Sequence, residues 1–148
     1  MSRRESSRRL GAGHRLILIR EQDAQHSGSG CCGRLGEAHT ALGGAADFSH
    51  SRALMEALGV VYRRLRDVAP GLSIDVVDSR NTIWLYPAVW RASRRAGYGL
   101  GASLKNLSRA GAATAVVLDG DVLFSGALPE PDSVVAAVMA HLHTACAA

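Results

Sequence analysis

The sequence predicts one α/β domain in which a four-stranded mixed sheet lies between two layers of helices. Strand-like and helix-like segments alternate along most of the chain, which is typical of parallel β-α-β units. A late pair of apolar runs joined by Asp119-Gly120 predicts an antiparallel hairpin. The length of 148 residues suits one domain and is short for two. We therefore expect a disordered tail over residues 1–13 and a single domain over residues 14–148.

The composition indicates which residues form the core and which partners to expect. Apolar residues make up 47% of the chain and aromatic residues only 5%, so the core must consist mainly of Ala, Val and Leu. The net charge is +4, and all of the basic residues except Lys105 are arginines. These arginines accompany no base-reading motif, so we expect solvated helix faces and no nucleic-acid partner.

The expected location is the cytoplasm, where thiols are normally kept reduced. Three cysteines form no disulfide-framework spacing, and the start of the chain lacks the apolar stretch of a signal peptide. The apolar run at residues 16–19 is too short to cross a membrane, so no membrane partner is expected.

The first half of the chain predicts two strands and the helix between them. Four apolar residues flanked by arginines predict a strand over residues 15–20, buried on both faces. A long connection rich in Gly and Ser follows at residues 21–50, with a short helix expected at residues 34–42. A stripe of apolar residues at helical spacing predicts a helix that ends before Pro70-Gly71, and residues 72–78 predict the second strand.

The second half predicts helices, a hairpin and a final helix. Residues 81–96 are expected to be mainly helical, with Pro87 in the first turn, where its missing N–H has no consequence. A short helix at residues 102–110 and a hairpin with strands at residues 114–119 and 122–124 follow. The last helix is expected at residues 129–145, with Pro131 in its first turn.

The predicted hairpin resembles a known pattern. The run Ala115-Val-Val-Leu-Asp-Gly-Asp-Val-Leu-Phe-Ser-Gly126, followed by Leu128-Pro129 and a helix, resembles the second half of thioredoxin-like proteins. The resemblance implies a thioredoxin-like fold with three α/β/α layers. Such proteins place a cis-proline before the third strand, and Ala113-Thr114-Ala115 takes that place here.

In its layout the chain is most similar to the arsenic metallochaperone family. That family also has a Cys-Cys loop after its first strand, here Cys31-Cys32, and a helix opened by a proline, here Tyr86-Pro87-Ala88-Val89. The family carries a third cysteine five residues after the pair, and the matching residue here is Glu37.

The cysteine loop is the one segment whose composition points to chemistry. Cys31 and Cys32 lie on a glycine-rich backbone that would let both thiols face one ligand. Arg34 and the start of a following helix would favour the thiolate, which binds soft ions and attacks disulfides. An imidazole from His26, with His39 and His50 as alternatives, would complete a site for Cu(I), Zn(II) or a similar ion.

Two classes of function stay open from the sequence. In the first, Cys31 is the nucleophile or first ligand, Cys32 its partner and His26 an auxiliary ligand or base, acting on a protein thiol or disulfide, Cu(I) or As(III). In the second, the cysteines are inert and the domain is a non-catalytic module that docks onto a partner protein through the loop at residues 21–50. Cys146, near the end of the chain, is expected to be inert in both.

Overall fold

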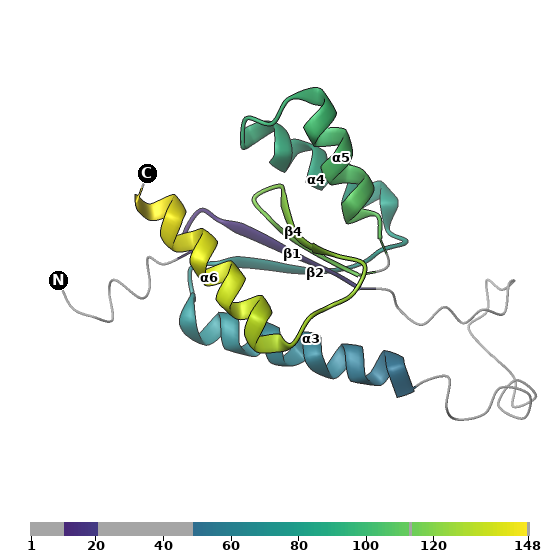
Figure 1. Cartoon of the computed structure of the whole chain (residues 1–148), viewed down its shortest axis with the longest axis vertical. Helices are drawn as coiled ribbons and strands as arrows, with labels where there is room; N and C mark the ends of the chain where they lie inside the picture. Colours follow the sequence, from purple (N-terminus) through teal and green to yellow (C-terminus); the bar gives the residue numbers. More distant parts are fainter. Residues whose placement is uncertain (1–10, 21–48, 113, 148) are drawn as a thin grey trace, which may run out of the picture.

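The computed structural model describes residues 11–20, 49–112 and 114–147 (Figure 1). Its strands are β1 (Arg15–Arg20), β2 (Ser73–Asp78), β3 (Ala115–Leu118) and β4 (Asp121–Ser125). Its helices are α3 (Ser49–Val68), α4 (Thr82–Arg95), α5 (Leu100–Ala110) and α6 (Pro131–Ala147). These elements confirm the α/β class, and the short helix expected at residues 34–42 lies outside the described residues.

The strands form one mixed sheet of four strands, as predicted, and their order in the sheet is β2-β1-β3-β4. β1 and β2 are parallel because the long helix α3 carries the chain back to the end of the sheet at which β1 starts, and β2 begins there. β3 is antiparallel to both β1 and β4, and a tight turn at Asp119-Gly120 joins it to β4.

Both faces of the sheet are covered by helices, which explains the uninterrupted apolar run of β1. Leu16 and Leu18 point into a core shared with α3 and α6. Ile17 and Ile19 point into a second core shared with α4 and α5. Figure 1 shows the two helix pairs on opposite sides of the sheet. Each such buried aliphatic side chain contributes about 1.5–3 kcal/mol to stability, so β1 anchors both layers.

The helices bury the faces that their periodicity predicts. In α3 the buried side chains are Leu58, Val61 and Leu65, and in α6 they are Val134, Val138 and Leu142. Arg64 of α3 also forms an ion pair with Asp132 of α6. Among the described residues, no helix combines the length and apolar character needed to cross a membrane.

The expected position of Pro87 was wrong. The helix begins at Thr82, and Pro87 lies within α4, beyond its first turn. The start is fixed instead by Asn81, whose carbonyl accepts bonds from the N–H groups of Trp84 and Leu85 at 3.2 and 2.9 Å. Proline was expected at the helix start because it lacks an N–H, but here helix packing against the sheet outweighs one missing bond.

Two residues before position 14 contact the domain. Gly11 is buried against Leu72, and Ala12 forms an isolated β-bridge with the same residue. A Cβ atom on Gly11 would lie 2.8 Å from the Cβ of Leu72, so this close approach requires glycine. Gly11 and Ala12, which the sequence analysis assigned to the tail, thus contact the domain.

Candidate functional site

The residues predicted to carry the chemistry are outside the described part of the chain. Cys31, Cys32, His26 and Arg34 all belong to residues 21–48, as do His39 and Glu37. His50 lies in the first turn of α3 and Cys146 in the last turn of α6. The structure therefore describes the two elements that flank the cysteine segment in the chain, a strand before it and a helix after it.

The described residues on either side of the cysteine segment lie at the same end of the sheet. β1 ends at Arg20, and α3 begins at Ser49. The guanidinium of Arg20 contacts the thioether of Met55, so the end of β1 lies beside the first turns of α3. In the sheet, Ile19 of β1 pairs with Ala115 at the start of β3.

A small cavity of about 290 Å³ lies at this edge. Its lining is mainly small and apolar and consists of Ala53, Leu54, Ala57, Thr114, Gly126, Ala127 and Leu128. Thr114 is buried, and its carbonyl accepts a 2.8 Å bond from the N–H of Gly126, which closes the base of the hairpin. Gly126 has φ +98°, a conformation that favours glycine.

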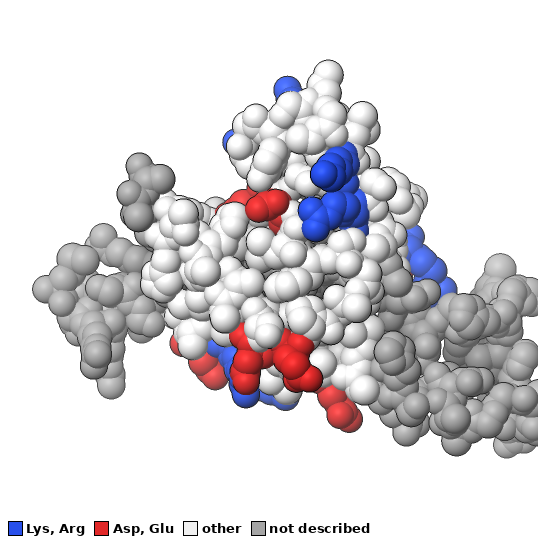
Figure 2. Space-filling model, in the orientation of Figure 1, with Lys and Arg blue, Asp and Glu red and all other residues white. Residues whose placement is uncertain are grey.

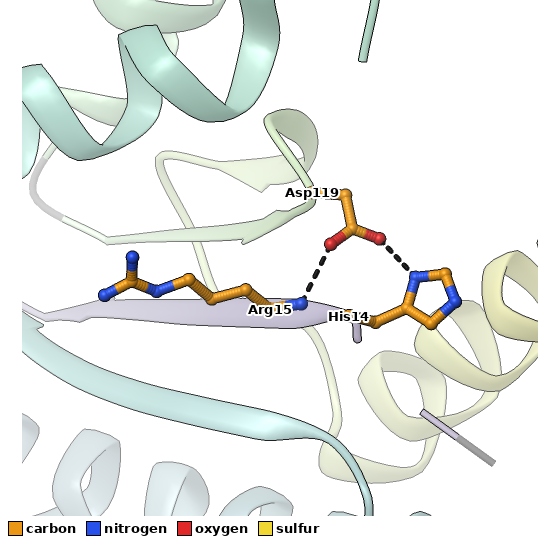
Figure 3. A network of polar contacts seen from close by, with 3 residues as sticks. All are labelled: His14, Arg15 and Asp119. Carbon is orange, nitrogen blue, oxygen red and sulfur yellow. Dashed lines mark hydrogen bonds and ion pairs between the residues drawn. The ribbon is translucent and has the colours of Figure 1, made fainter. Parts of the chain in front are cut away.

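The opposite end of the sheet carries a polar network centred on Asp119 (Figure 3). One carboxylate oxygen of Asp119 lies 2.6 Å from Nδ1 of His14, and the other accepts a 2.8 Å bond from the backbone N–H of Arg15. The backbone N–H of Asp119 donates to the carbonyl of Arg15 at 2.9 Å. These contacts join the start of β1 to the hairpin turn.

The Arg15 side chain leads away from Asp119, as Figure 3 shows. Its Nε donates a 2.7 Å bond to the carboxylate of Asp75 on β2. Its guanidinium carbon lies 5.3 Å from the centre of the Trp84 ring, within the range of a cation–π contact. Arg15 therefore links the sheet to α4.

The hairpin turn is held from its other side by buried polar groups. The carbonyl of Gly120 accepts bonds from the Ser93 hydroxyl at 2.9 Å and the Asn106 amide at 2.8 Å. Asp119 and Gly120 have φ values of 51° and 89°, the left-handed pair of a type I′ turn. A Cβ atom on Gly120 would lie 2.3 Å from the backbone nitrogen of Ser93, so this contact with α4 requires glycine.

Tyr98 follows α4 and faces the start of β4. Burial raises the pKa of Tyr98, and the charge of Asp121 and a hydrogen bond to its carboxylate raise this pKa further. The backbone N–H of Tyr98 donates to the carbonyl of Ser93 at 3.1 Å, and Arg94 donates to its carbonyl at 2.7 Å. The neutral phenol is thus a structural hydrogen-bond donor.

A larger cavity of about 570 Å³ lies between α4 and the network around Asp119. It is lined by Gly13, His14, Arg15, Ile83, Trp84, Pro87, Ala88, Arg91, Ala92, Arg95, Ala96 and Asp119. No motif in the sequence indicates this cavity. The four-residue spacing of Arg91 and Arg95 was the one signal, since it places both on one helix face.

Within the described part of the chain, no three His, Cys, Asp or Glu side chains lie close enough together to hold a metal ion. No protein-family model matches this chain, and neither the search of curated proteins nor that of solved structures found a significant match.

Proposed function

We propose that this chain is a thioredoxin-like protein in which Cys31 and Cys32 act together, in thiol–disulfide exchange or in binding a soft metal or metalloid ion. The strand order β2-β1-β3-β4 supports the fold part of this proposal. A parallel β1–β2 pair and an antiparallel hairpin beside β1 are the arrangement that the thioredoxin-like fold has.

The observation that carries the proposal is the attachment of the cysteine segment. Residues 21–48 leave the sheet at Arg20 and rejoin the domain at Ser49, beside the cavity that contains Thr114. In the thioredoxin-like arrangement the working cysteines follow the first strand and face the residues before the third strand. The same two positions border this edge of the sheet.

In the exchange reaction the two thiols act in sequence. The thiolate of Cys31 attacks one sulfur of a partner disulfide, so that a mixed disulfide forms and the partner's other sulfur leaves as a thiolate. The thiolate of Cys32 then attacks the Cys31 sulfur and releases the partner's second thiolate. The partner's disulfide is reduced by two electrons, and the pair is oxidised to a Cys31–Cys32 disulfide. Its eight-membered ring is strained and thus readily reduced.

In the binding mode the reduced pair supplies two thiolate ligands. Thiolates favour Cu(I) and As(III) over hard cations, and the imidazole of His26 would act as a third ligand. Arg34 stabilises the thiolates by its charge.

The test is binding of phenylarsine oxide, a reagent selective for paired thiols, to the fully reduced chain. We expect one equivalent to bind wild type and a Cys146→Ser control, and none to bind the Cys31→Ser/Cys32→Ser variant. Competition for Cu(I) with a chromogenic chelator should give the same ranking. Equal binding by all three proteins would overturn the dithiol proposal and favour the docking module at residues 21–50.

A further inference from the structure

The cavity between α4 and the start of β1 has the size and lining of a ligand site. Its volume of about 570 Å³ falls within the range of about 300–1,000 Å³ that is typical of small-molecule sites. One wall is a face of α4, and the other is formed by the residues around Asp119. It lies at the end of the sheet opposite Arg20, where the cysteine segment begins.

The charges that line this cavity are unbalanced. Arg15, Arg91 and Arg95 contribute guanidinium groups, of which that of Arg15 is paired with Asp75 outside the lining, and Asp119 contributes the one carboxylate of the lining. Both oxygens of Asp119 are already bonded, to His14 and to the backbone of Arg15. Among the described residues, no carboxylate forms an ion pair with Arg91 or Arg95.

Arg91 and Arg95 are neighbours on one face of α4, with Arg95 in the last turn of the helix. The two residues are four apart on α4, so their like charges lie on the same face and repel each other. An oxyanion between them would remove this repulsion and accept charged hydrogen bonds from both groups. Figure 2 shows basic side chains on the α4–α5 side of the visible face, with a few acidic atoms beside them, and most of the visible acidic side chains on the α3–α6 side, next to further basic ones.

An apolar surface adjoins these charges in the same cavity. Ile83 is 89% exposed, the highest fraction among the exposed large apolar side chains of the described residues. Trp84, which carries Arg15 above its ring, lies next to it in the lining. A flat apolar group bound here would cover hydrocarbon that otherwise faces water.

We propose that this cavity binds a small organic anion, with an oxyanion group held by Arg91 and Arg95 and an apolar or aromatic body packed on Ile83 and Trp84. The head group is a phosphate or a carboxylate, which share this recognition chemistry. The lining of this cavity contains no cysteine, so the anion site and the dithiol function can be tested independently.

Calorimetric titration of the full chain tests the site with four probes: 1-naphthyl phosphate, 1-naphthoate, uncharged 1-naphthol and inorganic phosphate. We expect saturable 1:1 binding of at least one naphthyl anion, and affinity about tenfold or more lower for naphthol and for inorganic phosphate. The tighter of the two naphthyl anions identifies the head group.

Two double variants locate the binding. Arg91→Ala/Arg95→Ala should weaken the naphthyl anion by about tenfold or more. Arg63→Ala/Arg66→Ala removes the same charge from exposed positions on α3 and should change affinity by less than about twofold. The site is refuted if neither anion saturates, or if both double variants behave alike. A circular dichroism spectrum identical to that of wild type ensures that the comparison concerns folded protein.

Discussion

At the scale of single residues, Asp119 makes more structural contacts than its position on a turn suggests. It accepts bonds from His14 and from the backbone of Arg15, and it adopts a positive φ of 51°. Asp and Asn tolerate this conformation better than other side chains with a Cβ atom. The side chain therefore fixes the turn and the start of β1 together.

Asp119→Ala should lower the free energy of unfolding by about 1–3 kcal/mol, because it removes both bonds and places Ala at a strained φ. Asp119→Asn keeps one acceptor oxygen and the tolerance for positive φ, so it should lose less than half as much. Urea unfolding monitored by tryptophan fluorescence measures both changes. Wild-type stability of Asp119→Ala would show that these contacts contribute nothing.

The raised pKa of Tyr98 predicts that the stability of the protein depends on pH in the alkaline range. Its pKa is raised above 10.0 in the folded protein, so the folded state retains the phenol proton more strongly than the unfolded state. The resulting stabilisation is fully present below the unfolded pKa and is lost as pH rises through the folded pKa. The difference in unfolding free energy between wild type and Tyr98→Phe should therefore be constant below pH 10 and shrink above it. A difference that stays constant on both sides of that pH would contradict this assignment.

At the scale of elements, the β3–β4 hairpin is held by its contact with α4. The carbonyl of Gly120 accepts bonds from Ser93 and Asn106, and its Cα lies against the α4 backbone. These contacts position the turn that carries Asp119. They also fix one wall of the cavity beside α4.

Gly120→Ala should destabilise the protein by more than about 3 kcal/mol, because the new methyl group collides with backbone and φ is +89°. Gly97→Ala is the matched control. Gly97 has φ +84° but no atom within 4 Å of the added Cβ, so only the conformational cost of about 1–2 kcal/mol applies. Thermal unfolding compares the two variants. Equal losses would mean that the hairpin can move away from α4.

The order and type of the described elements could be predicted because each carries a strong local signal. β1 is a short apolar run between arginines, and α3 has a regular apolar stripe before Pro70-Gly71. The bounds of α4 were predicted to within one residue, but Pro87 was expected in its first turn and lies further inside, because a general preference of proline for helix starts was applied where packing tolerates it. The contact of Gly11 with Leu72 depends on tertiary structure and leaves no local pattern.

At the scale of the whole molecule, the two proposed sites lie at opposite ends of β1. The cysteine segment joins the sheet at Arg20, and the anion cavity lies beside Arg15. The first and last residues of β1 are five steps apart, a span of about 17 Å. The variants proposed for the two sites change different residues, so each proposal has its own test.

The two sites also differ in how far the sequence predicts them. Two adjacent cysteines in a glycine-rich segment can be recognised as a candidate site from the local sequence alone. The cavity assembles Arg15, Asp119 and two arginines of α4 from three separate segments, so only the fold brings them together. No local pattern links His14 to Asp119, which is 105 positions away.

The proposed dithiol function requires that Cys31 and Cys32 are accessible, ionised thiols, and the pH dependence of their alkylation by iodoacetamide measures both properties. Mass spectrometry of digested, fully reduced protein gives the rate at each cysteine. We predict that at least one of the pair reacts with an apparent pKa below the value of about 8.5 for free cysteine, while Cys146 does not. Protection of both thiols, or an apparent pKa at or above that of free cysteine for each, would rule out a working dithiol at Cys31 and Cys32.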